Sequence, residues 1–305
     1  MLFRLGVLGY GEALEPYLAA IQGDRRIAIT RVWDADGDRA RRLAVAFRSS
    51  WCETPEQLMR GPVDAVLIGC AGAEQDRAIL LAVEAGCPFL TVPPGASHLA
   101  MARQVEARVR QKGLVATVSH VVEYMDAVQE AKEYLRTHPL VLASIWLYGV
   151  PRAGQSVLEL VWNPGSQIVH ALRFFAGEVL DVQGMCGDET LCATCRMSTG
   201  TIAQVVCARA GLAYDRMEME LVGPAWHLHF FQHMHKLRLT EKDRVVEIAV
   251  GNQPHRAHLE EFVRAVQQGK ASALASDYAQ AVETLRTCQA IIEAGSAGRI
   301  LPVAA

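Results

Sequence analysis

The sequence predicts an α/β Rossmann-type dinucleotide-binding domain followed by an α+β domain with a large, mainly antiparallel open sheet. Three observations carry this prediction. A glycine turn, Gly9-Tyr10-Gly11, separates an apolar run from a helical stretch. Apolar runs then alternate with helix-length segments as far as residue 118, which is typical of a parallel sheet. Beyond residue 180, short apolar runs follow one another closely, which indicates antiparallel strands.

The first 34 residues run as strand, turn, helix, strand and acid. An apolar run over 2–8 ends at Gly9, a helix is expected over 13–21, and a second run over 27–33 ends at Asp34. In dinucleotide sites such glycines let backbone N–H groups approach a pyrophosphate. An acid one strand later binds a ribose hydroxyl and favours NAD over NADP. The pattern therefore predicts NAD as the cofactor, with NADP as the alternative, bound by Gly9, Tyr10, Gly11, Glu12 and Asp34.

One position of this fingerprint departs from the usual pattern. Leu14 stands where Gly or Ala normally allows close packing of helix and strand. A leucine there is expected to push the helix outward and to weaken the hold on the pyrophosphate. The alternative interpretation is a βαβ unit of this kind that binds no nucleotide.

The remaining elements follow in order. The first domain is expected to continue with helices at 38–48, 54–56, 74–85 and 99–111 and strands at 63–68, 88–92 and 114–118. The alternation stops near residue 119, so the predicted domains are 1–118 and 119–305. The second is expected to contain helices 126–136, 165–175, 255–268 and 277–294 and strands 140–148, 180–185, 191–197, 202–209, 217–222, 227–231, 236–239 and 245–250. Its final helices are expected to pack back toward the first domain, and Gly295 to end the last of them.

The composition argues against several classes of partner. The chain has 305 residues, 51% of them hydrophobic, and a formal net charge of −3. That charge gives no electrostatic basis for binding nucleic acid or an anionic membrane. No apolar stretch is long enough to span a bilayer, and the first residues form a predicted strand instead of a signal peptide. We therefore expect a cytoplasmic protein with a small-molecule substrate, whose eight cysteines are buried thiols.

Two motifs have spacings found in metal sites, and both are interpreted structurally. Cys192 and Cys195 fall on a predicted strand, where residues three apart point to opposite faces. His227 and His229 are expected on one face of a strand, and likewise His233 and His235, with no carboxylate between them. The preferred interpretation is an exposed sheet face that packs against another subunit. No metal is predicted, and a homo-oligomer through this sheet is expected.

Several motifs accompany the order of elements. They are Gly9-Tyr10-Gly11, Val32-Trp33-Asp34-Ala35-Asp36 with Arg39-Ala40, Ala85-Gly86, and an ending with His258-Leu-Glu-Glu-Phe262, Asp277 and Gly298-Arg299. With these motifs the chain resembles, over nearly its full length, the glucose–fructose oxidoreductase / inositol dehydrogenase (Gfo/Idh/MocA) family. The resemblance implies an NAD(P)-dependent oxidoreductase in which Cys70, Ala71 and Pro94 line the nicotinamide side.

The residues that carry this family's chemistry are mostly changed. Val92-Pro93-Pro94 stands where the family has Glu-Lys-Pro, and Gln167 stands where it has a catalytic histidine. Gln75 likewise replaces a histidine of the loop that follows the third core strand. Oxidation of a secondary alcohol needs a base with a pKa near neutrality. Neither Pro93 nor Gln167 supplies one.

His170 is the predicted catalytic acid, acting together with Gln167. It lies three residues after Gln167, on the same face of a helix expected to begin with Asn163 as N-cap and Pro164 at the first position. Histidine is the side chain that titrates most readily near neutral pH. The alternative is a packed or solvated histidine without a catalytic role.

The segment Val118-Ser119-His120-Val121-Val122-Glu123-Tyr124-Met125-Asp126 resembles the biliverdin reductase branch of the same family. That resemblance implies hydride delivery to a conjugated carbon, a step that needs an acid and no base for a hydroxyl. The substrate contacts expected in the second domain are His120, Glu123, Tyr124 and Asn163. A third hypothesis is a catalytically inactive family scaffold that serves as a binding or partner subunit.

Overall fold

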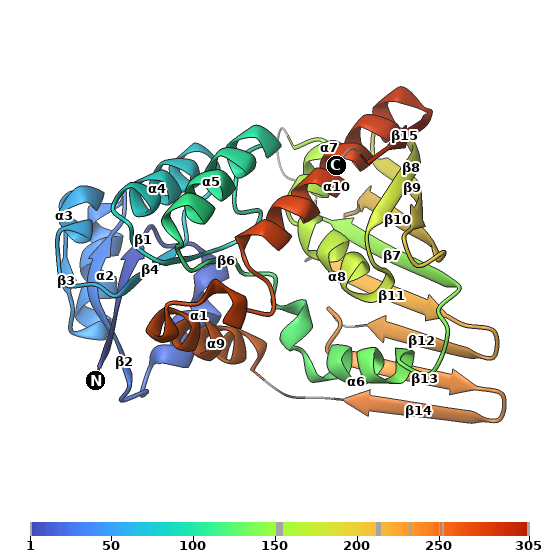
Figure 1. The fold of residues 1–305 in the computed structure, drawn as a ribbon, viewed down its shortest axis with the longest axis horizontal. Helices are drawn as coiled ribbons and strands as arrows, with labels where there is room; N and C mark the ends of the chain where they lie inside the picture. Colours follow the sequence, from blue (N-terminus) through green and yellow to red (C-terminus); the bar gives the residue numbers. More distant parts are fainter. Residues whose placement is uncertain are drawn as a thin grey trace. The chain divides into compact units, whose positions relative to one another are not determined.

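The computed structural model describes residues 2–150, 155–211, 215–231, 233–249, 251 and 253–303 (Figure 1). The chain divides into two compact units. Unit 1 comprises Met1–His120 and Pro254–Val282, and unit 2 comprises Val121–Gln253 and Glu283–Ala305.

Unit 1 is built on a parallel sheet with the strand order β3-β2-β1-β4-β5-β6 (Figure 1). Its strands are β1 (Phe3–Leu8), β2 (Ile27–Trp33), β3 (Ser50–Trp51), β4 (Ala65–Ile68), β5 (Phe89–Thr91) and β6 (Ala116–Val118). The order reverses between β1 and β4, and open α/β sheets bind ligands at the carboxyl ends of the strands at such a point. β1 and β4 are paired in parallel as far as Leu8 and Ile68, so the turns that follow them are neighbours.

Helices cover both faces of this sheet, which is why all four residues of β4 are buried. They are η1 (Glu12–Leu14), α1 (Glu15–Ile21), α2 (Gly37–Phe47), α3 (Pro55–Met59), α4 (Gly72–Glu84), α5 (Leu99–Lys112), α9 (Pro254–Gln268) and η3 (Ala271–Ala273). The N-caps of α2 and α3 are Asp36 and Thr54, whose side chains accept backbone N–H groups of the first turn. The helix α10 (Tyr278–Ala297) begins in unit 1 and ends in unit 2.

Unit 2 is built on a sheet of order β14-β13-β12-β11-β7-β10-β9-β8-β15. All neighbouring strands are antiparallel except β7 and β10, which are parallel. The strands are β7 (Leu142–Gly149), β8 (Val179–Cys186), β9 (Thr190–Met197), β10 (Ile202–Arg209), β11 (Arg216–Val222), β12 (Trp226–Phe231), β13 (Lys236–Glu241), β14 (Arg244–Ala249) and β15 (Ile300–Pro302). The predicted fold class is confirmed in both of its parts.

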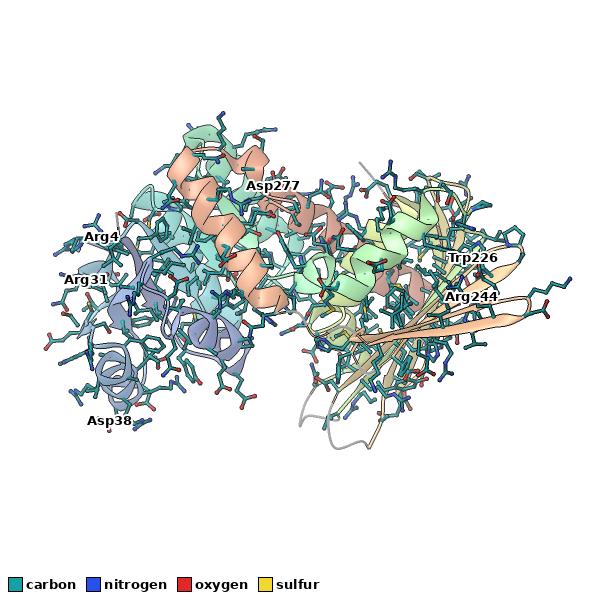
Figure 2. All side chains as sticks on the ribbon, turned by 90° about the horizontal axis from the view of Figure 1, so that it is seen from below. Arg4, Arg31, Asp38, Trp226, Arg244 and Asp277 are labelled. Carbon is teal, nitrogen blue, oxygen red and sulfur yellow. The ribbon has the colours of Figure 1, made fainter. Side chains whose placement is uncertain are left out.

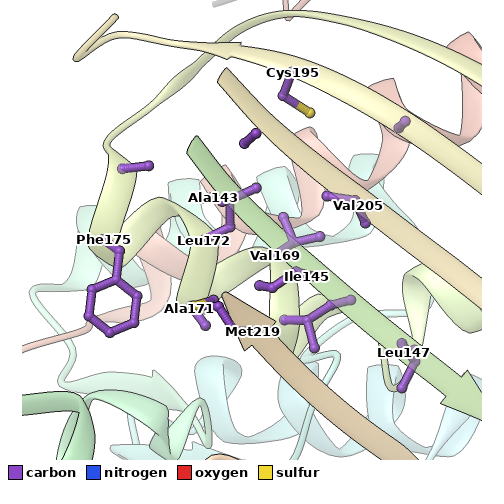
Figure 3. Close-up of a cluster of buried hydrophobic side chains, with 14 of the residues drawn as sticks. Ala143, Ile145, Leu147, Val169, Ala171, Leu172, Phe175, Cys195, Val205 and Met219 are labelled. Carbon is purple, nitrogen blue, oxygen red and sulfur yellow. The ribbon is translucent and has the colours of Figure 1, made fainter. Parts of the chain in front are cut away.

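One face of this sheet is covered by helices. They are η2 (Val121–Tyr124), α6 (Asp126–Leu135), α7 (Val157–Trp162), α8 (Ser166–Ala176) and the end of α10. Ala143, Ile145 and Leu147 of β7 pack against Val169 and Leu172 of α8 in the core shown in Figure 3. Nine of the eleven residues of α8 are buried. Polar side chains on α8 are therefore forced into the interior.

Strand β9 confirms the expected face assignment of the two cysteines. Its residues alternate strictly between exposed and buried, which leaves Cys192 exposed and Cys195 buried. The two thiols therefore lie on opposite faces of the sheet.

Three local predictions are wrong. Asn163 closes α7 instead of opening α8, because α7 has its own capping box, formed by Ser156 and Glu159. The N-cap residue of α8 is Gly165, which has no side chain to cap it. The helix α10 continues past Gly295 to Ala297, and a Cβ on Gly184 of β8 would lie 2.8 Å from the Gly295 nitrogen. This close helix–strand approach, not helix termination, explains Gly295.

The third error concerns the histidines after β12. His227 and His229 share one face of β12, as predicted, with ring centroids 6.2 Å apart. His233 and His235 lie instead in the turn before β13, and His233 has a φ of 55°. The extended alternation expected for that pair ends at Phe231.

Candidate active site

The glycine turn at the end of β1 packs directly on the turn at the end of β4. Gly9 has a φ of +71°, and a Cβ there would lie 2.7 Å from the Cβ of Cys70. A Cβ on Gly11 would lie 2.5 Å from the main-chain oxygen of Gly69. Side chains would force these two turns apart, so the sequence needs glycine at both positions.

Leu14 is accommodated by Gly69, a residue that the sequence patterns did not single out. The leucine side chain is fully buried, and a Cβ on Gly69 would lie 2.3 Å from the Cδ1 of Leu14. The leucine therefore occupies the space that a side chain at position 69 would need. The small residue directly after the apolar run at 63–68 was the signal that could have revealed this compensation.

Asp34 lies at the carboxyl end of β2, and its carboxylate accepts three hydrogen bonds. Its Oδ2 accepts the Tyr10 N–H at 2.7 Å. Its Oδ1 accepts the Asp36 N–H at 2.7 Å and Nη2 of Arg39 at 2.7 Å. The carboxylate thus ties the glycine turn to the start of α2.

Cys70, Ala71 and Pro94 lie around the ends of β4 and β5 in unit 1. Cys70 is buried, and burial raises the pKa of its thiol to about 12, so this side chain is neutral. Ala71 is exposed at the N-terminus of α4. Pro94 is buried in the segment that follows β5. Glu12 is exposed on the first turn after the glycines.

Gln75 holds the segment that leads from β5 into Pro93-Pro94, where Pro93 stands at the position of the family's lysine. Its Nε2 donates to the Val92 carbonyl at 2.7 Å and to the Thr91 hydroxyl at 3.0 Å. A carbonyl only accepts, so these contacts determine the orientation of the amide. Gln75 therefore has a structural role at the start of the Pro93-Pro94 corner, and it carries no titratable proton.

These features of unit 1 fit a dinucleotide. The cradle formed by Gly9 and Gly11 has no room for a Cβ, and Asp34 lies beside it at the end of the neighbouring strand. A carboxylate has about four lone-pair positions, of which three are used here. One acceptor position remains for a ribose hydroxyl.

The predicted catalytic residues lie in unit 2. His170 of α8 and Glu123 of η2 are both buried, with Nε2 of His170 3.6 Å from Oε1 of Glu123. Burial, with a contribution from Arg173, lowers the pKa of His170 to about 3. The prediction that His170 titrates near neutral pH is therefore wrong, because the packing of α8 removes it from water. Burial also raises the pKa of Glu123 to about 7.

Residues far apart in sequence orient His170. Its Nδ1 lies 3.2 Å from the hydroxyl of Thr284 on α10, and the same hydroxyl accepts Nη1 of Arg173 at 2.8 Å. Thr284 can donate its own proton to Nδ1, which leaves the imidazole proton on Nε2, the atom that faces Glu123. Arg173 is held in turn by Glu178 at 2.7 Å. Thr284 and Arg173 were not predicted, since no local sequence signal connects α8 with α10.

The other predicted catalytic and substrate-binding residues lie on different elements. Gln167 is half-buried on α8, one turn before His170. Tyr124 is half-buried at the end of η2, and Asn163 is half-buried at the end of α7. His120 is buried and is the last residue of the first segment of unit 1. The structure thus brings Glu123 and His170 together and leaves Asn163 in a helix-ending role.

Neither a metal-ligand cluster nor a membrane-spanning helix occurs in the described part of the chain. No group of three or more His, Cys, Asp or Glu residues there could hold a metal ion. Among the same residues, no helix combines the length and apolarity needed to cross a bilayer.

Residues 3–120 match a family described as an oxidoreductase family with an NAD-binding Rossmann fold, the Gfo/Idh/MocA family. No curated protein matches the chain. Levoglucosan dehydrogenase in complex with NADH is similar in structure, with a TM-score of 0.87, 14% identity and 100% of both chains covered. An oxidoreductase from Agrobacterium radiobacter, in complex with NAD+, L-tartaric acid and magnesium, has a TM-score of 0.85, 14% identity and 99% of both chains covered.

A third similar structure is UDP-N-acetylglucosamine 3-dehydrogenase from Acidithiobacillus ferrooxidans, with a TM-score of 0.83, 17% identity, and coverage of 97% of this chain and 99% of that one. At such identities the structures establish a shared fold. The predicted family resemblance is confirmed, and the sequence match that carries it lies in the NAD-binding domain. This match supports an NAD(P)-dependent oxidoreductase.

Proposed function

We propose that the chain is an NAD-dependent oxidoreductase of this family whose active site lacks the usual Lys/His pair. The single observation that carries the proposal is the cradle of Gly9 and Gly11, tied to Asp34 through the Tyr10 N–H. Bound NADH supplies the hydride. The amides of the turn from Gly9 to Glu12 would hold the diphosphate, Asp34 would bind the adenosine ribose, and Cys70, Ala71 and Pro94 would line the nicotinamide side.

Proton transfer in this proposal falls to Glu123, with His170 as its positioning residue and Gln167 as a neutral hydrogen-bonding partner of the substrate. Glu123 keeps its proton up to a pKa of about 7 because it is buried. A neutral His170 beside it, oriented by Thr284, does not compete for that proton. A group with a pKa near the working pH is suited to general acid catalysis.

This assignment favours a substrate that is reduced at a conjugated or imine-like bond. Such a reduction adds a hydride to carbon and one proton to nitrogen, so an acid is sufficient. Dehydrogenation of a sugar alcohol needs a base instead, and neither Pro93 nor Gln167 is one. Below about pH 7, where Glu123 keeps its proton, the site presents an acid and no base, which supports the biliverdin-reductase-like alternative over sugar oxidation.

Coenzyme binding tests the proposal first. The fluorescence of NADH is titrated with the wild-type chain and with Asp34→Ala, and we expect saturable binding that the substitution weakens by about tenfold or more. The absence of any NADH or NADPH binding would favour the inactive scaffold. Sugars, imines and linear tetrapyrroles are then assayed with NADH or NAD+. Reduction of imines or tetrapyrroles without oxidation of sugars is the expected result, and sugar oxidation alone would refute the assigned chemistry.

A homo-oligomer through the sheet of unit 2 is part of the same proposal. Met185 and Ile202 are apolar, and 75% and 43% exposed, on β8 and β10. The alternating burial of β10 places Ile202 on the face opposite the core. Light scattering should give more than one chain per particle, and Ile202→Lys should shift the wild-type particle toward a monomer. A wild-type monomer at high concentration would contradict the proposed assembly.

A further inference from the structure

One buried histidine on α9 reaches the helix that follows the glycine turn. His258 belongs to the ending motif His258–Phe262, and α9 packs against α1 within unit 1 (Figure 1). Its Nδ1 lies 2.6 Å from the hydroxyl of Tyr17 on α1, and its Nε2 lies 3.1 Å from the hydroxyl of Thr117 on β6. A single imidazole therefore bridges the first α-helix of unit 1 and the last strand of its sheet.

The hydrogen bonds around His258 have a defined direction. The Thr117 hydroxyl donates its proton to the Ser276 carbonyl at 2.8 Å, so it accepts from Nε2 of His258. In the neutral imidazole Nδ1 then carries no proton and accepts the Tyr17 hydroxyl. Burial raises the pKa of that phenol, which keeps its proton in place. Ser119 completes the chain by donating to the Tyr17 oxygen at 2.5 Å.

These side chains hold Tyr17 in one position. All the residues of the network are buried: Tyr17, Thr117, Ser119, His258 and Ser276. Ser276 directly precedes Asp277, labelled in Figure 2, where α10 is about to begin. Buried polar groups cannot exchange their partners for water, so each hydrogen bond favours a single arrangement. The Tyr17 ring is therefore fixed by β6, by α9 and by the segment before α10.

The short helix α1 depends on such anchors. It has only seven residues, and the side chain of its N-cap residue, Leu14, caps no backbone N–H. Helices of this length are not stable in isolation. The helix also continues directly from the glycine turn, because the Leu14 N–H donates to the Gly11 carbonyl at 2.9 Å and the Glu15 N–H donates to the Glu12 carbonyl. A displacement of α1 therefore displaces the amides of the turn.

We propose that His258 and Tyr17 are positioning residues for the coenzyme, because they hold α1 and, through it, the amides of the Gly9–Gly11 turn in the geometry that a diphosphate requires. His258 acts through Tyr17, and Tyr17 acts through the backbone of α1. The inference rests on the proposed function, since it concerns the same coenzyme site.

The test measures dissociation constants of NADH by calorimetry for wild type, Tyr17→Phe, His258→Leu and the double variant. Each single variant should weaken NADH binding by about fivefold, the effect of one lost hydrogen bond. The double variant should bind no more weakly than His258→Leu, because both changes break the same contact. His258→Asn keeps an acceptor near the position of Nδ1, so it should recover most of the lost affinity.

Val105→Ala is the matched control for a loss of stability, because Val105 is a fully buried residue of α5 outside the network. It should lower the unfolding temperature and change the NADH dissociation constant by less than about twofold. Hydrogen exchange of the amides from Glu12 to Ile21, recorded without coenzyme, is a second readout. It should accelerate in Tyr17→Phe and His258→Leu and stay unchanged in Val105→Ala.

Two outcomes would overturn the inference alone. They are NADH affinity that is unchanged in Tyr17→Phe and His258→Leu, and an equal loss of affinity in Val105→Ala. In both cases NADH binding by wild type would still support the proposed function. Failure of wild type to bind NADH would overturn the inference and the proposed function together.

Discussion

The coenzyme turn of unit 1 and the α8 region of unit 2 differ in what fixes their local structure. The turn depends on missing side chains, because Gly9, Gly11 and Gly69 allow two loops and one leucine to approach closely. The α8 region depends on buried polar side chains, because His170 and Arg173 are enclosed with Glu123 and Thr284. The turn has kept the features that a dinucleotide requires. The α8 region has Gln167 at the position predicted for a catalytic histidine and encloses His170 with Glu123.

The largest effect is expected at Gly11. A Cβ there meets the main-chain oxygen of Gly69, which cannot rotate away as a side chain can. Gly11→Ala should weaken NADH binding by about 100-fold and lower the free energy of unfolding by about 3 kcal/mol. Gly37→Ala is the matched control, because a Cβ at that helical position has nothing within 4 Å. The two variants are compared by calorimetric titration and urea unfolding, and equal effects would show that the turn is not closely packed.

The buried pair of unit 2 should be visible in the pH dependence of stability. The pKa of Glu123 is raised to about 7, so its contribution to stability is complete below the unfolded value of 4.5 and is lost as pH rises to about 7. The pKa of His170 is lowered to about 3, so its contribution is present above 6.5 and is lost as pH falls below that value. Between pH 4.5 and 6.5 the two trends oppose each other.

The free energy of unfolding of the wild type should therefore change little between pH 4.5 and 6.5, whereas that of each single variant should change with pH. The free energy of unfolding of Glu123→Gln should rise with pH, and that of His170→Gln should fall, each by up to about 1.4 kcal/mol per pH unit. Arg173 and Glu178, the charged groups next to His170, are retained in both variants. Urea unfolding at several pH values measures the slopes. Slopes near zero in both variants would contradict the burial of a neutral pair, because an ionised pair exchanges no proton on unfolding in this window.

A smaller effect is expected where Leu14 meets Gly69. Gly69→Ala should cost about 2 kcal/mol, since its Cβ would lie 2.3 Å from the leucine and 2.7 Å from the Gly9 oxygen. Leu14→Ala should cost about 3 kcal/mol through the cavity it leaves. The double variant should cost less than the sum, because the new Cβ fills part of that cavity. Additive costs in a double-mutant cycle would show that the two positions do not compensate each other.

The smallest effect is expected at Asn163, where the sequence predicted a helix N-cap. Asn163→Ala should change stability by less than about 0.5 kcal/mol, because its backbone N–H, bonded to the Glu159 carbonyl at 2.9 Å, closes α7. Ser156→Ala, which removes the capping box of α7, should cost about 1 kcal/mol. Thermal unfolding of both variants provides the comparison. A larger loss at Asn163 than at Ser156 would restore the capping role.

The difference between the two regions also explains what the sequence could predict. Strand and helix periods, the glycine turn and Asp34 are local patterns, and they were sufficient for the fold class and the dinucleotide cradle. The state of His170 depends on its burial beside Glu123 and on Thr284, which lies 114 positions away in the chain, so no local pattern contains it. The compensation of Leu14 by Gly69 is likewise a contact between η1 and the residue that follows β4, which are distant in sequence. Asn163 was misplaced because the apolar run at 157–162 forms a helix of its own before it.

A crystal structure grown with excess NADH is the most direct test of coenzyme binding at the Gly9–Gly11 cradle. We expect the diphosphate against the backbone from Gly9 to Glu12 and the adenosine ribose at Asp34, with Leu14 still packed on Gly69. Saturating NADH that leaves the Gly9–Gly11 cradle vacant, or binds elsewhere on the chain, would contradict it.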